Sequence, residues 1–294
     1  SSLESIATAA AKIESGLADL VIAGGFERSS TQPFRMWNPN HPDYQEGKCY
    51  TVAKFIPDLQ GEQVMLEGAE KTALTENVTK AEMDPWVLLS HKRAAQAAKE
   101  GILSDIQLSI EGSRKDEGIR PSMSQRLLDR LPYILPGGKV ITAANACLMH
   151  DGAAFVVLCS EKYRKVHKLS PQAAFRFGTS IGSDPFMSPK TAVLAIRKLF
   201  KQTGLSIDEI DSLEVNEAFA VIDVLLEREF PGIRDRLNPL GGALAYGHPY
   251  GASGAIILLH LLKNLQVNKG RFGICGVAAA GGIGTSLLVE RLKA

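Results

Sequence analysis

The sequence predicts an α/β fold built of layered sheets and helices. Short apolar runs rich in β-branched residues alternate with longer segments whose apolar residues recur at helical spacing. A unit of helix, strand and double glycine occurs near the start of the chain and again near its end. Alternating strands and helices are typical of layered α/β folds, and the repeated unit indicates an internal duplication.

The first of these units lies at the start of the chain. Residues 3–13 are rich in alanine and have apolar residues at helical spacing, so we expect a helix that ends before Gly16. Residues 18–23 are short and rich in β-formers, which predicts a buried strand that ends at Gly24-Gly25. A strand of this kind suits the delivery of a turn to a functional site.

An insert and a second α/β region follow the first unit. Residues 26–131 differ in composition, with Pro, Asn, Tyr and Trp in 32–50 and helical patterns in 61–74 and 85–100, so we predict an inserted loop domain. The further predicted elements are strands at 153–158, 173–181, 213–215 and 271–277, and helices at 194–203, 217–229 and 252–264. The last strand precedes Gly281-Gly282, which completes the second unit.

Composition excludes several classes of protein. With 294 residues, 45% apolar and 22% charged, the chain is large enough to bury one or two hydrophobic cores. A net charge of +1 gives no basic field for nucleic acid or an anionic membrane, and no apolar run reaches the roughly 20 residues of a membrane span. The four cysteines have no CxxC spacing, so we expect reduced thiols in a cytoplasmic compartment and no metal site.

The start of the chain is unusual. Ser1-Ser2 is neither an initiator methionine nor the basic front of a signal peptide, and the sequence runs directly into the first helical pattern. We therefore expect that the chain begins inside a domain.

Three polar or glycine-rich segments stand at the ends of predicted elements, at residues 216–220, 247–254 and 278–284. Strand ends are where α/β folds place their sites. His248 stands between glycine and proline, so we expect its ring on a constrained turn beside a helix start. A lone histidine is more often structural, but the surrounding pattern favours a functional one. For residues 278–284 the plain alternative is a tight, closely packed turn.

Together these segments resemble the thiolase family, and the resemblance extends over nearly the whole chain. The most specific pieces are NEAFA at 216–220, NPLGG at 238–242 and GHPYGASGA at 247–255. Supporting pieces are AGGFERSS from Ala23, SHKRAAQAAKEG from Ser90, DEGIRP from Asp116 and TAANACLMHDGAA from Thr142.

The resemblance implies a layered α/β/α/β/α fold of two duplicated halves, the first of them incomplete. Residues 1–25 and 132–160 correspond to the remainder of the N-terminal half, and residues 161–294 to the C-terminal half. Residues 26–131 correspond to a loop domain that covers coenzyme A (CoA).

The resemblance also implies an acyl-CoA acyltransferase, in which a cysteine thiolate attacks an acyl-CoA thioester and passes the acyl group to CoA or to another acyl-CoA. The nucleophilic cysteine is expected just before Ser1, at the N-terminus of the first helix, which lowers its pKa. His248 resembles the histidine that activates the nucleophile, and Asn216 the asparagine that positions a water in the first oxyanion site. The backbone N–H of Ala280 aligns with a donor of the second oxyanion site.

The sequence departs from the family pattern at the second cysteine, which removes a proton from the α-carbon of the acyl acceptor. An ungapped reading places Ala278 at that position, and a methyl group is not a base. Cys275 lies three residues earlier on the predicted strand, where alternation turns it to the opposite face. We expect Cys275 to be a buried structural thiol, with a catalytic role as the alternative.

Further differences lie where pantetheine and the acyl group would bind. Cys147 replaces a serine, Leu148 a glycine, and Val64 a histidine that precedes Met65, so the acyl preference stays open. The residues expected to bind acyl-CoA are Met65, Ala143, Cys147 and Phe219, with Lys92, Arg93 and Arg114 as cations for the CoA phosphates. The alternative for these cations is a solvated helix face.

The leading prediction is a thiolase-like acyltransferase that, as this chain stands, lacks its nucleophile and is inactive. CoA or acyl-CoA is expected as a substrate and not as a permanently bound cofactor. A homodimer, a homotetramer or a companion chain is expected to cover the exposed apolar sheet edges of the incomplete half. The alternatives are a noncatalytic protein that binds CoA or a partner enzyme, which Ala278 favours, and an acyltransferase whose acceptor needs no α-proton removal.

Overall fold

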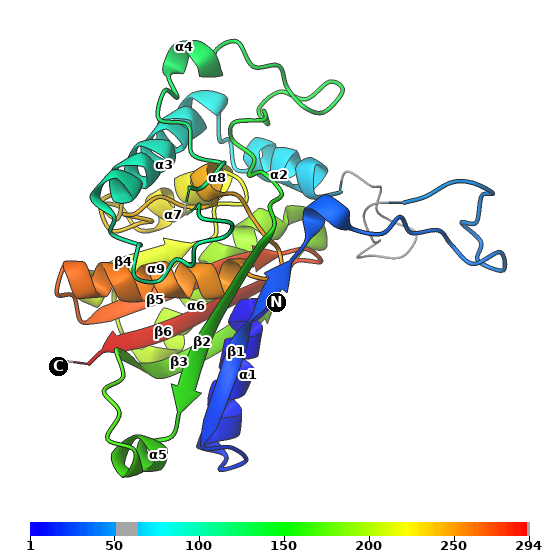
Figure 1. Cartoon of the computed structure of the whole chain (residues 1–294). Coiled ribbons are helices and arrows are strands. Elements are labelled where there is room, and N and C mark those ends of the chain that lie inside the picture. The colour runs from blue at the N-terminus through cyan, green and yellow to red at the C-terminus, as the bar shows by residue number, and fades with distance from the viewer. Residues whose placement is uncertain (51–63, 114, 293–294) are drawn as a thin grey trace.

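The computed structural model describes residues 1–50, 64–113 and 115–292 (Figure 1). Four strands form the larger sheet in the order β3-β6-β5-β4, with bounds β3 (Ala173–Gly182), β6 (Ile283–Arg291), β5 (Phe272–Ala279) and β4 (Ser212–Val215). β6 pairs antiparallel with β3 and β5, whereas β4 and β5 are parallel. The smaller sheet consists of the antiparallel strands β1 (Leu20–Glu27) and β2 (Gly152–Cys159).

Two helices, α1 (Ser2–Glu14) and α9 (Ser253–Val267), lie between the two sheets (Figure 1). Leu3 and Ile6 of α1 pack with Leu258 and Leu261 of α9 in this middle layer, and all four are buried. On the other face of the larger sheet lies α6 (Thr191–Thr203), with α7 (Val221–Glu229) beside it. This succession of sheet, helices, sheet and helices confirms the predicted layered α/β fold.

The outer face of the smaller sheet carries large apolar side chains that remain exposed. Ile22, Phe26 and Val157 are 69%, 72% and 67% exposed, and Ile22 faces Val157 across the strand pair. Within the part of the chain that the structure describes, no helix packs on this face, so the fifth layer of the predicted arrangement is not formed there.

The described residues between β1 and β2 include three α-helices that lie beyond one edge of the layers (Figure 1). They are α2 (Val64–Thr75), α3 (Lys80–Glu100) and the single turn α4 (Gln125–Leu128). The α3 helix starts with a capping box, in which Thr79 and Glu82 exchange side-chain and backbone hydrogen bonds. It ends at Gly101, whose φ of 64° suits glycine.

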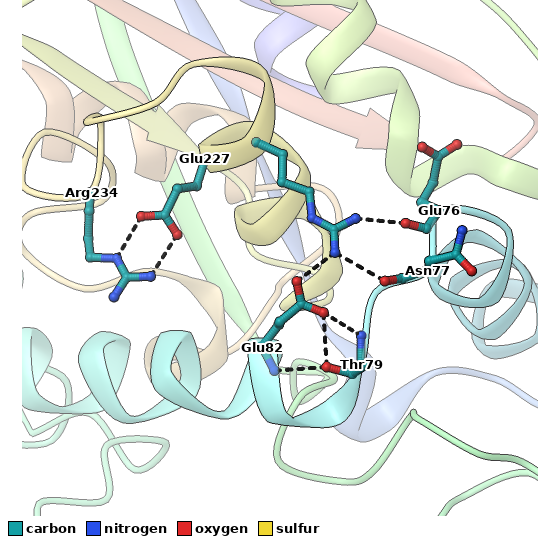
Figure 2. Close-up of polar contacts among 7 residues, drawn as sticks. Glu76, Asn77, Thr79, Glu82, Glu227 and Arg234 are labelled. Carbon is teal, nitrogen blue, oxygen red and sulfur yellow. Dashed lines mark hydrogen bonds and ion pairs between the residues drawn. The ribbon is translucent and has the colours of Figure 1, made fainter.

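Arginine side chains from the C-terminal half fix the start of α3 (Figure 2). Arg228 of α7 donates to the backbone oxygens of residues 76 and 77, at 2.7 and 3.1 Å, and to the carboxylate of Glu82 at 2.5 Å. The guanidinium of Arg234 lies over the ring of Trp86, 4.8 Å from its centroid. These contacts hold α3 against α7 and thereby set the position of Ser90, two turns further along α3.

One predicted strand boundary was wrong. β1 does not end at Gly24-Gly25 but continues through them to Glu27. A Cβ atom on Gly25 would lie 2.0 Å from the oxygen of Gly251, and one on Gly24 would lie 2.1 Å from the oxygen of Ala154. The two glycines are therefore required for close backbone packing within a strand and not for a turn.

Three helix starts also differ from the prediction. The α3 helix begins at Lys80 instead of residue 85, α6 begins at Thr191 instead of residue 194, and α7 begins at Val221 because residues 216–220 form a turn. The remaining elements are α5 (Glu161–Val166), α8 (Ala243–Tyr246) and the 3₁₀ helices η1 (Ser29–Thr31), η2 (Pro185–Lys190) and η3 (Ile207–Glu209). Among the described residues, no helix combines the length and apolar character that crossing a bilayer requires.

Candidate active site

Two turns at the carboxyl edge of the larger sheet bring Asn216 and His248 together. Because β4 and β5 are parallel, their carboxyl ends lie at one edge, and Asn216 directly follows β4. The N–H of Asn216 donates to the oxygen of Gly276 at 2.9 Å, which ties the turn to β5. His248 follows α8, and Nδ2 of Asn216 lies 3.2 Å from Nε2 of His248.

The side-chain amide of Asn216 is buried and only partly satisfied. The residue is 1% exposed; Nδ2 is directed at His248, whereas Oδ1 has no partner among the described residues. Leaving a buried acceptor without a partner costs about 1–3 kcal/mol, so such atoms usually bond to water or to a ligand. Oδ1 is therefore available to accept a hydrogen bond from a molecule bound at this turn.

The hydrogen bonds of His248 indicate which ring nitrogen carries the proton. Oγ of Ser253 lies 2.6 Å from Nδ1 of His248 and 3.0 Å from the carbonyl oxygen of Pro249. A hydroxyl has one hydrogen and a carbonyl only accepts, so both contacts are satisfied when Ser253 donates to Pro249 and accepts from Nδ1–H. Nε2 then has a lone pair directed at the amide of Asn216, as a general base requires.

The first turn of α1 lies close to this imidazole. Burial is the main cause that lowers the pKa of His248 to about 4. The ring is therefore neutral at pH 7 and able to accept a proton. Oγ of Ser1 also contacts the backbone oxygens of Tyr250 and Gly251, at 3.4 and 3.5 Å. The positive end of the α1 dipole thus lies beside the turn that carries His248.

Tyr250 and Ser253 are site residues that the sequence analysis missed. The ring of Tyr250 meets that of His248 edge-on, with centroids 4.7 Å apart. Burial raises the pKa of Tyr250 to about 12, and the neighbouring Cys147 and Glu27 act in the same direction. Both missed residues stand within five positions of His248, in a turn that enters a helix, and this proximity was the available signal.

Cys275 and Ala278, the residues considered for the position of the second cysteine, lie on opposite faces of β5. Cys275 is fully buried among the α1 and α9 side chains of the middle layer, and burial raises its thiol pKa well above the usual value. Ala278 packs on the other face, against the core that includes Phe219. Ala280 lies in the β5–β6 turn just before Gly281, whose φ is 79°. The thiol of Cys275 is therefore turned away from the face that carries Ala278.

A buried carboxyl group links the Asn216 turn to α3. Glu217 accepts hydrogen bonds from Oγ of Ser90 (2.6 Å), Nδ2 of Asn238 (3.0 Å) and the N–H of Leu244 (3.3 Å). The same Ser90 oxygen accepts from the N–H of Gly242 at 3.1 Å. Burial raises the pKa of Glu217, and these donors oppose that effect. The network joins the helix, the turn after β4 and the loop that leads to His248, which sequence spacing alone does not reveal.

Three of the four residues expected near the pantetheine and acyl group belong to one apolar core. Met65, Cys147 and Phe219 pack in the same apolar core, whereas Ala143 is exposed. The N–H of Cys147 donates to the oxygen of Ala218 at 2.9 Å, so this segment lies directly beside the turn that follows Asn216. Burial raises the pKa of the Cys147 thiol to about 12, which makes it a poor nucleophile at neutral pH.

The three cations proposed for the CoA phosphates have different environments. Lys92 lines a cavity of about 1120 Å³ beside α3. Arg93 instead donates to the backbone oxygens of Leu237 and Arg234, at 2.7 and 2.8 Å, so its guanidinium holds the loop that precedes Asn238. Arg114 lies outside the described residues.

Two protein-family domains match the chain. The description "Thiolase, N-terminal domain" matches residues 1–162, and "Thiolase, C-terminal domain" matches residues 169–291. The chain is 32% identical over 310 residues to a beta-ketoadipyl-CoA thiolase of Escherichia coli, which covers 99% of this chain and 77% of that protein. It is 33% identical over 298 residues to the steroid 3-ketoacyl-CoA thiolase FadA6 of Mycobacterium tuberculosis, and the match covers 99% of this chain and 73% of that protein.

Solved thiolase structures have a fold similar to that of this chain. Human mitochondrial 3-ketoacyl-CoA thiolase in complex with CoA superposes with a TM-score of 0.90 at 29% identity, covering 100% of this chain and 76% of the human chain. The Bacillus anthracis acetyl-CoA acetyltransferase superposes with a TM-score of 0.88 at 29% identity, and the match covers 99% of this chain and 77% of that chain.

Proposed function

Because this chain belongs to the thiolase family, we propose that it acts as a thiolase-like acyl-CoA acyltransferase, with Asn216 and His248 as its catalytic side chains. The family and the fold class predicted from the sequence are both confirmed. The relatives are thiolases that act on 3-ketoacyl-CoA substrates, and two of the similar structures contain CoA. They support an acyltransferase that uses CoA thioesters.

In the proposed mechanism, a cysteine bonded to the nitrogen of Ser1 is the nucleophile. Its thiol would lie at the N-terminus of α1 and beside the turn that carries His248, because Oγ of Ser1 contacts the backbone oxygens of Tyr250 and Gly251. The neutral imidazole takes the thiol proton on Nε2, and the helix dipole favours the thiolate that results. The thiolate then attacks the thioester carbonyl carbon, the C–S bond to CoA breaks, and the CoA sulfur takes the proton from Nε2 of His248, which leaves an acyl-cysteine.

The oxyanions of this reaction need hydrogen-bond donors. We assign Asn216 to the first oxyanion site, where its free Oδ1 accepts from a water molecule whose other hydrogen is directed at the substrate oxygen. The backbone N–H of Ala280 is assigned to the second site, for the acyl-cysteine. The observation that carries the proposal is the Asn216–His248 contact of 3.2 Å with one buried amide oxygen left to accept.

Thiolysis kinetics test this assignment. The chain is prepared with a family N-terminal segment that ends in cysteine directly before Ser1, and cleavage of acetoacetyl-CoA is followed. His248→Asn and Asn216→Ala should each lower kcat by about 10²–10³-fold, as losses of a general base or an oxyanion donor do. The matched exposed controls, His167→Asn and Asn40→Ala, should keep the parent rate. Parent-like turnover in either site variant would refute the assigned role.

A second candidate is a noncatalytic protein that binds CoA or a partner enzyme, and Ala278 is the observation that favours it. A third retains acyl transfer but uses an acceptor that needs no α-proton removal. The retained Asn216–His248 pair argues for an enzyme, because a binding protein has no evident need for a neutral imidazole beside an unsatisfied amide. A stable acyl-cysteine without Claisen turnover would identify the third candidate.

We also propose the cellular compartment and the oligomeric state of the protein. The free cysteines suit a reducing compartment such as the cytoplasm. The exposed apolar face that carries Ile22, Phe26 and Val157 suits coverage by further polypeptide, in a homodimer, a homotetramer or a complex with a companion segment. Acyl-CoA is assigned as substrate and no permanently bound cofactor is assigned.

A further inference from the structure

Residues 148–152 run beside the turn that carries His248 and contact it at more than one point. The N–H of His248 donates to the carbonyl oxygen of Leu148 at 2.7 Å. Further along the segment, a Cβ atom on Gly152 would lie 2.8 Å from Cγ of Pro249, the residue that follows His248. The segment therefore packs closely against the backbone on which the imidazole of His248 stands.

The imidazole of His150 makes the closest contact between this segment and the turn. A Cβ atom on Gly247 would lie 2.5 Å from Cγ of His150, 2.6 Å from Nδ1 and 2.8 Å from Cδ2. Because these three adjacent ring atoms are nearly equidistant from that point, the flat face of the ring lies against the backbone of Gly247. Gly247 also has a φ of 87°, a conformation that glycine adopts readily and other residues do not. The ring thus supports the residue directly before His248.

The outer edge of the same ring lies near the segment that contains Gly118. A Cβ atom on Gly118 would lie 3.2 Å from Cε1 of His150 and 2.4 Å from the carbonyl oxygen of Ala245, which belongs to α8. Burial raises the pKa of the nearby Asp116, and the charge of His150 opposes that rise. The ring is therefore enclosed between this segment on one side and the turn of His248 on the other.

Hydrogen bonds from the residues after β1 anchor the backbone around His150. Oγ of Ser29 donates to the carbonyl oxygen of His150 at 3.4 Å. The N–H of Ser30 donates to Oδ1 of Asp151 at 2.9 Å, and the hydroxyl of Ser30 donates to Oδ2 of the same carboxylate. These hydrogen bonds hold the pKa of Asp151 below its usual range, so the acceptor is charged at neutral pH. The ring is therefore held in place against Gly247 from behind.

We propose that His150 is a positioning residue that supports the turn of His248 through the backbone of Gly247. The contacts of the His248 ring, 3.2 Å to Asn216 and 2.6 Å to Ser253, depend on where this turn places the imidazole. A shift of about 1 Å in a catalytic group lowers a rate by up to about 10²-fold. This role rests on the acyltransferase function proposed above and adds to it a residue that acts through another.

The ring atoms that face Gly247 determine which variants test this role. Asparagine has Cγ, Oδ1 and Nδ2 where histidine has Cγ, Nδ1 and Cδ2, so His150→Asn keeps the flat group against Gly247 and removes only the edge near Gly118. His150→Ala removes the flat group as well. His150→Gln keeps much of the side-chain volume but places a tetrahedral methylene group against Gly247, so it separates the shape of the side chain from its size.

Thiolysis of acetoacetyl-CoA, by the chain prepared with the nucleophile as above, measures the effect. His150→Ala should lower kcat by about 10–10²-fold and change KM less than about twofold, because alignment is lost and substrate binding is not. His150→Gln should lose about tenfold in kcat, whereas His150→Asn should keep kcat within about threefold of the parent. The matched control, His167→Ala, removes an exposed imidazole that stacks on Tyr163 and should keep the parent rate.

Nuclear magnetic resonance of histidine labelled with nitrogen-15 adds a readout that needs no catalysis. His248 should show the Nδ1–H tautomer in the parent and in His150→Asn, and a mixture of tautomers in His150→Ala and His150→Gln. Circular dichroism verifies folding, and His150→Gln decides if His150→Ala does not fold. Parent-like kcat and His248 signals in His150→Gln, or equal losses in His150→Asn and His150→Ala, would overturn the proposal. A parent without thiolysis would count against the acyltransferase function alone, and the tautomer of His248 would still decide the role of His150.

Discussion

Replacing Ser90 by alanine tests whether the buried network around Glu217 holds the active-site turn in place. The Ser90 hydroxyl donates to Glu217 at 2.6 Å and accepts from the N–H of Gly242 at 3.1 Å, and all three residues are buried. The substitution removes both hydrogen bonds at once. It leaves Glu217 with the donors Asn238 and Leu244, and leaves Gly242 with an N–H that loses its side-chain partner.

The expected loss follows from those two bonds. A buried hydrogen bond to a carboxyl group contributes about 1.5–3 kcal/mol, and a buried N–H without a partner costs about 1–3 kcal/mol. Partial relaxation makes the two effects less than additive, so we expect the free energy of unfolding to fall by about 2–4 kcal/mol. For a chain of this size that corresponds to a drop of roughly 5–15 °C in the unfolding midpoint.

Urea and thermal unfolding measure this change, and Ser122→Ala is the matched control. Ser122 is exposed, so its removal should change stability by less than about 0.5 kcal/mol. In a preparation that carries the nucleophile, kcat should also fall for Ser90→Ala, because Glu217 directly follows Asn216. A Ser90→Ala variant as stable as Ser122→Ala would refute the view that this network supports the turn.

Three further predictions concern histidine and the residues beside the site. Burial lowers the pKa of His260 from 6.5 to about 4, so its contribution to stability is complete above pH 6.5 and is lost as the pH falls toward 4. His260→Gln should therefore reduce the pH dependence of the unfolding free energy between pH 4 and 6.5 by about 1.4 kcal/mol per pH unit. An unchanged slope in the variant would contradict this. Ser253→Ala should lower kcat about tenfold with little change in KM, whereas Ser253→Thr should retain the rate, since the hydroxyl accepts from Nδ1–H of His248; equal rates for all three proteins would exclude a positioning role. Ala278→Cys should raise thiolysis of acetoacetyl-CoA by about 10²–10⁴-fold while leaving acylation nearly unchanged, and efficient thiolysis with Ala278 in place would show that another group is the base.

Many of the helices and strands could be predicted because local patterns carry them, but β6 (Ile283–Arg291), which pairs with both β3 and β5, was not among the predicted strands. Helical spacing in residues 3–13 and 252–264 marks the two helices of the middle layer, and short apolar runs mark β3, β4 and β5. The predicted end of β1 was wrong, because a Gly-Gly pair such as Gly24-Gly25 is typical of a turn. Gly25 must be glycine for a different reason: the backbone of Gly251, far away in the chain, packs too close to it for a Cβ atom.

The site was accessible from the sequence only in part. Asn216 and His248 were found through the resemblance to a family, since no local pattern brings together two side chains separated by 32 residues. The tautomer set by Ser253 and the network of Ser90 with Glu217 depend on three-dimensional contacts that spacing does not encode. The hydrogen bonds from the Arg93 guanidinium to the backbone oxygens of Leu237 and Arg234 are likewise contacts that spacing does not encode.

Covalent labelling is the most direct test of an acyltransferase built on Asn216 and His248. The chain with a cysteine directly before Ser1 is incubated with labelled acetyl-CoA, and the adduct is located by intact and peptide mass spectrometry. We predict one acetyl group per chain on that cysteine, a rate of labelling at least about tenfold lower in His248→Asn, and none when the cysteine is replaced by alanine. Absence of label on the parent protein, or label on Cys147 in its place, would contradict the account.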